Sequence, residues 1–120
     1  FYNNHTPSAP LGTPENRKES TAYVDPGESR PCYWMGGFNG GTKDEFMKMS
    51  KANKDNIDKD MENDIVAVWH DESHLNRYLI SNQEKVMTLL PSYGYPESWQ
   101  LQYPRKILML DKNHEEIRKV

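Results

Sequence analysis

The chain has 120 residues, a formal net charge of −3 and 35% hydrophobic residues, so its core would be thin beside the roughly 45 to 50% (glycine included) of ordinary globular domains. The acidic balance gives no reason to expect a nucleic acid as partner, because nucleic-acid binders gather Lys and Arg on one face. One cysteine, Cys32, excludes an internal disulfide and a Cys-rich zinc site. No run approaches the roughly 18 apolar residues that cross a bilayer, so we expect a soluble segment, and its start at Phe1 favours a fragment.

The first 31 residues are expected to be mostly loop. Most of the prolines fall there, and a proline removes a backbone donor and biases the residue before it away from helix. Within this region, residue types favour a short strand at Thr21–Val24 and a second strand at Cys32–Phe38. Between them, Asp25–Glu28 has the composition of a turn.

A helix is predicted to begin directly after the glycine-rich run Gly36–Gly41. Thr42 and Glu45 have the spacing of a capping box, which satisfies free N–H groups at a helix start. The helix is expected to run through Lys59. Its inner face is only weakly apolar and consists of Phe46, Met49, Asn53 and Ile57.

The second half alternates short apolar and polar segments. Asp64–Trp69 is too short to be assigned to helix or strand from periodicity alone. Ser73–Ser81 is predicted to be helical, with one face formed by Leu75, Tyr78 and Leu79. Val86–Leu90 and Ile107–Leu110 are predicted to be buried strands, and the charged end, Asp111–Val120, to be mobile.

The densest group of reactive side chains lies where the apolar run meets the second helix, at Trp69-His70-Asp71-Glu72-Ser73-His74-Leu75-Asn76. One interpretation is a solvated helix start with Asp71 near the N-cap. Another is a metal site, because His70 and His74 have the spacing of the H-E-x-x-H zinc proteases. In that motif a glutamate follows the first histidine as general base, whereas here Asp71 does. A third ligand would have to be His5, His114 or a distant carboxylate.

The glycine-rich run also has two interpretations. It could simply form a strand-to-helix turn, and it matches neither the dinucleotide-binding nor the P-loop fingerprint. Because Gly36 and Gly37 lack side chains, a flat polar ligand such as a sugar ring could instead lie against the main chain. The aromatic residues could pack on the apolar faces of sugars as well as fill a core.

Three strings of residues, taken in order, resemble glycosyltransferase family 6, the family of the histo-blood-group A and B transferases and the α-1,3-galactosyltransferases. They are Tyr33-Trp34-Met35-Gly36-Gly37-Phe38 with Gly40-Gly41, then Trp69 through Leu79, then Lys112-Asn113-His114 with Arg118. The resemblance covers residues 1–120 but only the second half of a family catalytic domain. It implies an α/β fold, namely the C-terminal half of a GT-A fold, without the N-terminal half that holds most of the nucleotide site. The segment Tyr95–Trp99 is more similar to bacterial or phage-type members, for which a cytoplasmic location would be expected.

The same resemblance implies that Glu72 is the catalytic carboxylate of a retaining transfer from a UDP-sugar. Such a carboxylate captures or stabilises the oxocarbenium-like anomeric carbon that forms when the bond to UDP breaks. Asp71 is implied to bind hydroxyls of the donor sugar. Trp69 and His70 are implied to line the acceptor, and Thr13 aligns with a family threonine near it.

Met35, Gly36 and Gly37 match the donor-sugar selector of the family. In the blood-group enzymes a glycine at the third position leaves room for an N-acetyl group, so Gly37 favours UDP-GalNAc, whereas Met35 is associated with galactose. We favour the glycine because it acts directly on the available volume. Lys112 and Arg118 match two cations of the family's C-terminal tail, which would stabilise the charge on the departing diphosphate.

The resemblance therefore implies a retaining α-1,3-glycosyltransferase that moves GalNAc or Gal from UDP-GalNAc or UDP-Gal to a galactose-containing glycan. The need for Mn²⁺ stays open, because the family's metal motif would lie in the absent N-terminal half, and no residue of this chain is assigned to a metal. The alternative is a carbohydrate-binding or catalytically inactive remnant of such an enzyme. In that case the aromatic residues and glycines would hold a sugar without activating a donor.

Overall fold

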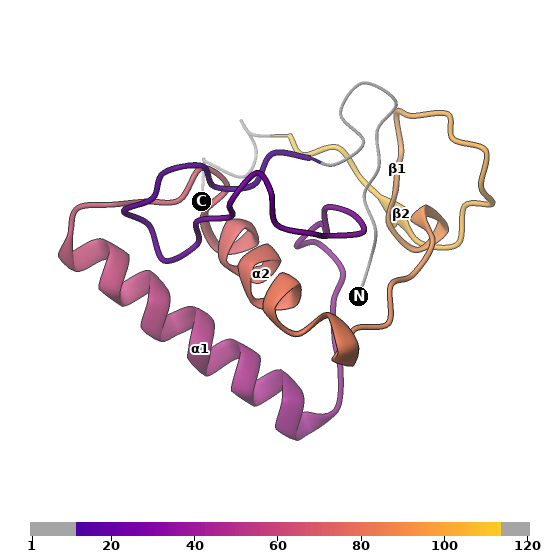
Figure 1. Ribbon diagram of the computed structural model, residues 1–120. Helices are drawn as coiled ribbons and strands as arrows, with labels where there is room; N and C mark the ends of the chain where they lie inside the picture. The colour runs from indigo at the N-terminus through magenta and orange to yellow at the C-terminus, as the bar shows by residue number, and fades with distance from the viewer. Residues whose placement is uncertain (1–11, 114–120) are drawn as a thin grey trace.

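Two α-helices that pack against each other form the centre of the structure, a computed structural model that describes residues 12–113. In Figure 1, α2 lies between the longer α1 and the N-terminal segment, and two short strands lie on the far side of α2. The elements in chain order are α1 (Lys43–Glu62), α2 (His70–Ser81), the 3-10 helices η1 (Gln83–Lys85) and η2 (Pro91–Gly94), β1 (Tyr95–Pro96) and β2 (Leu108–Met109). This mixture of helices and strands agrees with the predicted α/β class.

Helix α1 begins where the capping box predicts and ends three residues later than expected. The Thr42 hydroxyl accepts the backbone N–H of Glu45 at 3.4 Å, which satisfies one of the free donors of the first turn. At the other end, Asn63 donates its side-chain amide to the Lys59 carbonyl and its backbone N–H to the Asp60 carbonyl. These bonds extend the helix beyond Lys59. Of the predicted inner face, Met49 is buried and Phe46 is exposed.

Helix α2 begins at His70, three residues before the predicted start, and ends at Ser81 as predicted. The Ser73 hydroxyl accepts the backbone N–H of Trp69 at 2.9 Å and so closes the first turn. Leu75 and Leu79 are buried, as their spacing predicts, because this face of α2 points into the core. The reactive string is therefore the first two turns of a helix whose opposite end is anchored by packing.

The hydrophobic core lies where α1, α2 and the segment before the glycines meet. Its buried members are Val24, Cys32, Trp34, Met49, Leu75, Leu79 and Ile80. Trp34 also donates its indole N–H to the Thr88 hydroxyl at 3.1 Å, which connects the segment after η1 to this core. Burial raises the pKa of the Cys32 thiol to about 11, so this cysteine behaves as a small apolar side chain.

Three predicted strands do not form in the part of the chain that the structure describes. Thr21–Val24 is reduced to a single bridge between Tyr23 and Glu15. Cys32–Phe38 is irregular, because at Trp34 a helix side chain takes the hydrogen bonds that a neighbouring strand would make. Val86–Leu90 contains no strand element, and Met87 and Leu90 are exposed, so the prediction of a buried strand is wrong. The turn at Asp25–Glu28 is confirmed by a hydrogen bond from the Glu28 N–H to the Asp25 carbonyl.

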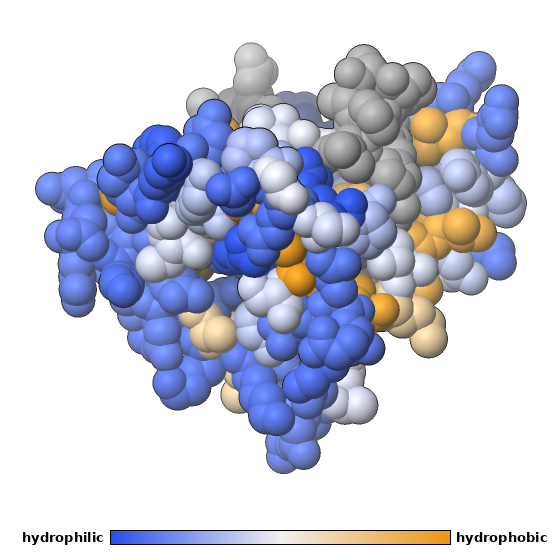
Figure 2. Space-filling view, in the orientation of Figure 1, coloured by the Kyte–Doolittle hydropathy of each residue, from blue (hydrophilic) through white to orange (hydrophobic). Residues whose placement is uncertain are grey.

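The predicted strand at Ile107–Leu110 is shorter and more exposed than expected. Only Leu108–Met109 forms β2, which pairs in parallel with β1, with Tyr95 opposite Leu108. Glu97, directly after Pro96, still donates its N–H to the Met109 carbonyl at 2.9 Å, and beyond it the Asp111 N–H bonds to the Glu97 side chain. Figure 2 shows a largely hydrophilic face on which hydrophobic residues gather around this strand pair. Among residues 12–113 no helix is both long and apolar enough to cross a bilayer.

Candidate active site

Glu72 lies in the first turn of α2 with its carboxylate against the glycine-rich run. The Tyr33 hydroxyl donates to Oε1 at 2.6 Å, and the Gly36 backbone N–H donates to Oε2 at 2.7 Å. Each carboxylate oxygen therefore has a donor from the 33–36 segment, almost forty positions earlier in the chain. Two donors of this kind fix the direction of a carboxylate.

Tyr33 is buried and keeps its proton at any ordinary pH. Burial raises the pKa of the Tyr33 hydroxyl far above its usual range, and the hydrogen bond to the Glu72 carboxylate raises it further. Gly12 lies directly against the ring: a Cβ added there would fall 2.1 Å from Tyr33 Cγ, and its φ of +63° is left-handed. Only glycine allows this close approach. The N-terminal segment thus holds the donor to Glu72 in place.

The predicted donor selector is brought to the same place as Glu72. A Cβ at Gly36 would lie 3.4 Å from Glu72 Oε2, so the main chain here passes close to the carboxylate. A Cβ at Gly37 would lie 3.1 Å from Met35 Cε and 3.6 Å from Met109 Sδ. Two methionines therefore flank Gly37, one from its own segment and one from β2.

Trp69, His70 and Asp71 are exposed at the entrance to α2. His70 has a left-handed φ of +50°, a conformation that histidine adopts more readily than most residues and that is costly enough to mark functional segments. His70 and Asp71 line a cavity of about 320 Å³ that faces the end of α1. Glu72 points to the glycines instead, since successive helix residues are turned by about 100°. The structure therefore does not gather Asp71 and Glu72 on one side.

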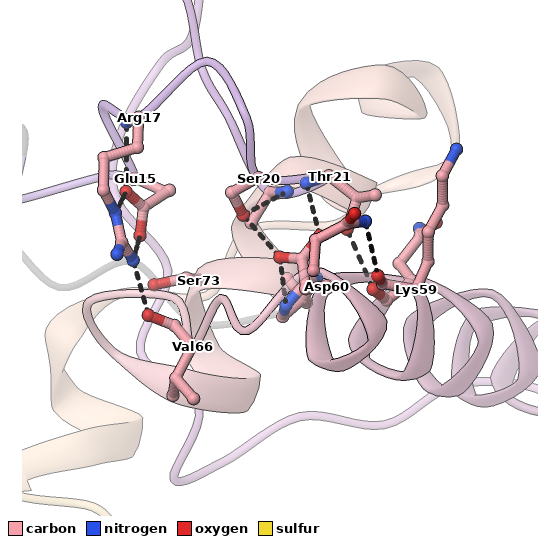
Figure 3. Close-up of polar contacts among 12 residues, drawn as sticks. Glu15, Arg17, Ser20, Thr21, Lys59, Asp60, Val66 and Ser73 are labelled. Carbon is pink, nitrogen blue, oxygen red and sulfur yellow. Dashed lines mark hydrogen bonds and ion pairs between the residues drawn. The ribbon is translucent and has the colours of Figure 1, made fainter.

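A buried carboxylate supports the loop that leads into this helix (Figure 3). Glu15 accepts the backbone N–H of Val68 at 2.6 Å and two bonds from the Arg17 side chain, and Arg17 also donates to the Val66 carbonyl. The ionised form of Glu15 is so well satisfied that its pKa falls to about 2, chiefly through the bond from Arg17. The backbone before Trp69 is thus held at two points, by Glu15 at the Val68 N–H and by Arg17 at the Val66 carbonyl.

His74 is a structural residue in this arrangement. It is buried, and its Nε2 lies 3.6 Å from Asp60 Oδ2, while Asp60 also accepts the Ser20 hydroxyl at 2.6 Å and the Thr21 N–H at 2.8 Å (Figure 3). Burial lowers the pKa of His74, and the nearby Asp60 charge offsets only part of that. His70 is exposed and His74 is buried, although both line the cavity of about 320 Å³. Within residues 12–113 no group of three or more His, Cys, Asp and Glu could hold a metal ion.

The remaining predicted residues lie at the margins of the described chain. Thr13 is exposed and directly follows Gly12, which packs on Tyr33. Lys112 is exposed and comes three positions after Met109. Arg118 lies outside the described residues. A separate, mostly apolar cavity of about 480 Å³ is lined by residues 38–42 and by parts of α1, α2 and residues 85–89. Glu72 does not line it.

Four supporting residues carry no role predicted from the sequence. Tyr33 lies inside the first of the three family strings, and Met109 and Glu15 lie outside all of them. Asn76 was part of the reactive string as well. A signal was present for it, because an asparagine directly between the apolar residues of a helix face is an anomaly that calls for hydrogen-bond partners.

The amino-acid sequence is similar to those of known glycosyltransferases. A sequence model of glycosyltransferase family 6 matches residues 2–119. The rat histo-blood group ABO system transferase 2 is 36% identical over 110 residues, which are 88% of this chain and 32% of that protein. The Escherichia coli O-antigen biosynthesis glycosyltransferase WbnI is 32% identical over 101 residues, 84% of this chain and 42% of the relative.

A third relative is the chicken globoside alpha-1,3-N-acetylgalactosaminyltransferase 1, which is 31% identical over 109 residues, 87% of this chain and 31% of that protein. The chain thus spans less than half the length of these curated relatives. The family match extends over nearly all of it, including every predicted site residue. The chain therefore belongs to glycosyltransferase family 6.

Proposed function

We propose that this chain carries the catalytic carboxylate and the donor-sugar selector of a retaining α-1,3-glycosyltransferase with a GT-A fold, which moves GalNAc or Gal from UDP to a galactose-containing glycan. The observation that carries the proposal is the pair of hydrogen bonds that aim Glu72 at the glycine-rich run. A sugar lying on Gly36 and Gly37 would have its anomeric carbon beside this carboxylate. Membership of a glycosyltransferase family supports the reaction class.

In the reaction, the bond between the anomeric carbon and the UDP oxygen breaks, and its electron pair leaves with the diphosphate. Glu72 either forms a bond to the anomeric carbon or stabilises it as an ion pair. The acceptor hydroxyl then bonds to the same carbon, any bond to Glu72 breaks with its electron pair returning to the carboxylate, and the hydroxyl proton passes to the departed diphosphate. In the covalent route the anomeric carbon is inverted twice, and in the ion-pair route the acceptor bonds on the face that UDP leaves. Both routes retain the anomeric configuration.

The fixed donors around Glu72 have a clear role in this step. A carboxylate that is already oriented needs no reorganisation when positive charge develops on the sugar. Tyr33 and Gly36 provide that orientation, and each oxygen keeps a lone pair for the sugar.

The selector acts through volume at Gly37. Met35 and Met109 close in on this glycine from two directions, so a single methyl group there would consume space that an N-acetyl group needs. Gly37 therefore favours GalNAc over Gal. Met109 would bound this space from β2.

The other residues serve the two ends of the substrates. Lys112 and Arg118 would neutralise the diphosphate, which gains negative charge as it leaves. Trp69, with its exposed indole, would pack on the acceptor sugar, with Thr13 nearby. Asp71 and His70 would reach sugar hydroxyls from the α1 side of the helix start.

The test is an assay of the full-length protein with UDP-GalNAc and UDP-Gal, with and without Mn²⁺, and with a galactoside acceptor. We expect turnover of at least one donor, which Glu72→Gln abolishes and Glu84→Gln, an exposed glutamate in η1, leaves unchanged. No turnover of either donor, with sugar binding intact, would instead support a carbohydrate-binding protein.

A further inference from the structure

Asn76 is a polar side chain in the middle of the core. It is 1% exposed and lies one helical turn after Glu72, directly beside the buried Leu75. Such a group is tolerated inside a protein only when its hydrogen bonds are made, because a buried amide without partners has lost the hydrogen bonds that it makes to water in the unfolded chain. The question is therefore which groups it binds and what they do.

Two of its bonds go to one residue of the selector segment. Asn76 Oδ1 accepts the Trp34 backbone N–H at 2.8 Å, and Nδ2 donates to the Trp34 carbonyl at 2.7 Å. A strand neighbour makes the same two bonds to a residue that it faces. The Asn76 side chain thus makes the pair of bonds to Trp34 that a neighbouring strand would otherwise make, and it holds the 33–36 segment against α2.

The third bond goes to Glu72 itself. Asn76 Nδ2 donates to the Glu72 backbone carbonyl at 2.9 Å. One amide group therefore joins the main chain at Trp34 to the main chain at Glu72. Only one orientation of the amide serves all three partners, since two of them are carbonyls and one is an N–H.

These bonds stand between the two donors that reach the Glu72 carboxylate. Tyr33 precedes Trp34, and Gly36 follows it by two positions. If Trp34 shifts along α2, both the Tyr33 hydroxyl and the Gly36 N–H move relative to Oε1 and Oε2. Gly37, on which the choice of donor sugar is proposed to depend, moves with them.

We propose that Asn76 is a positioning residue that sets the distance between the donor-selector segment and the Glu72 carboxylate, and through it both the turnover rate and the choice between UDP-GalNAc and UDP-Gal. This inference rests on the proposed function. It assigns to Asn76 no contact with a substrate.

The decisive variant is Asn76→Asp in the full-length protein. It keeps the shape and the acceptor oxygen but sets a second oxygen against the carbonyls of Trp34 and Glu72. A matched control is Asn82→Asp at the C-cap of the same helix: Asn82 donates its side-chain amide to the Tyr78 carbonyl at 2.8 Å, four positions back, and not to the selector segment. We expect kcat per folded molecule to fall by about 100-fold in Asn76→Asp, as small displacements of reacting groups do, and little change in the control.

The readout that separates positioning from mere stability is donor choice. In Asn76→Asp, the ratio of kcat/KM for UDP-GalNAc to that for UDP-Gal should move toward equality, with the folded fraction measured by circular dichroism. If Asn76→Asp does not fold, Asn76→Ser serves the same purpose, because its hydroxyl can still bond to the Glu72 carbonyl but is too short to reach Trp34. A folded variant with the wild-type ratio and kcat would overturn the inference.

Failure of the proposed function would look different, since wild-type protein would then turn over neither donor. In that case amide hydrogen exchange still tests the hydrogen bonds between Asn76 and Trp34. The Trp34 N–H of the wild-type protein should exchange as slowly as the buried amides of α2, and faster in Asn76→Ser. Exchange of this N–H as fast as in exposed loops would overturn the proposal whatever the activity.

Discussion

Glu15 and Val68 are 53 positions apart, yet the Glu15 carboxylate accepts the Val68 backbone N–H at 2.6 Å. This bond fixes the main chain immediately before Trp69 and the first turn of α2. Arg17 completes it by binding both Glu15 and the Val66 carbonyl (Figure 3). The N-terminal segment therefore anchors the start of α2, the helix that carries Glu72.

Glu15→Gln should destabilise the full-length protein near neutral pH by roughly 3 kcal/mol, the value that corresponds to a pKa lowered from 4.5 to about 2. Because the folded protein holds this carboxylate ionised, its contribution is present above pH 4.5 and is lost as the pH falls toward 2. Urea unfolding at a series of pH values would measure it. The free energies of unfolding of wild type and variant should converge at acid pH, and a constant difference between them from pH 7 to pH 2 would contradict this account. Glu62→Gln, on the exposed end of α1, is the control.

Tyr33→Phe should lower kcat by about 10- to 100-fold with little change in stability, because it removes a preorganised donor to a charged carboxylate while keeping the ring. Tyr23→Phe removes a hydroxyl whose carboxylate partner is Asp25, away from the site, and should have no effect on turnover. Steady-state kinetics of both variants decide the matter. Equal kcat in wild type and Tyr33→Phe would remove Tyr33 from the mechanism.

Gly37→Ala should shift donor preference from UDP-GalNAc toward UDP-Gal. The added methyl would lie 3.1 Å from Met35 Cε and 3.6 Å from Met109 Sδ, so it would fill the space beside the selector. Gly41→Ala adds the same methyl group where nothing lies within 4 Å and should leave the ratio unchanged. Competition between the two donors in one reaction measures the preference directly, and an unchanged ratio in Gly37→Ala would count against a volume-based selector.

Gly12→Ala should destabilise the protein by more than about 2 kcal/mol, since it combines a left-handed residue with a steric conflict. Its Cβ would fall 2.1 Å from Tyr33 Cγ, which cannot be relieved without moving the ring. Gly27→Ala, where the methyl would meet only the Asp25 carboxylate at 3.4 Å, is the comparison. Urea unfolding of both variants measures the difference in their free energies of unfolding. Equal free energies would show that the Tyr33 ring can move to make room for the methyl group.

Local sequence signals predicted the helices well and the strands poorly. The capping box at Thr42 and Glu45 acts within one turn, and the Leu75 and Leu79 spacing acts within one helix, so both could be recognised without knowing the rest of the fold. Cys32–Phe38 was wrong as a strand for the opposite reason. Its residue types favour extended backbone, but whether such a segment joins a sheet depends on a partner elsewhere in the chain.

The family could be recognised from the sequence, and Glu72 and the glycines could be predicted as site residues, because they lie in contiguous strings of distinctive residues. The tertiary structure alone decided that Tyr33 and Gly36 donate to Glu72, that Asn76 joins the two strings and that Glu15 holds the loop before them. Each of these contacts links residues between 36 and 53 positions apart. Contacts at that separation arise from the packing of the two helices against the N-terminal segment, and no local pattern records them.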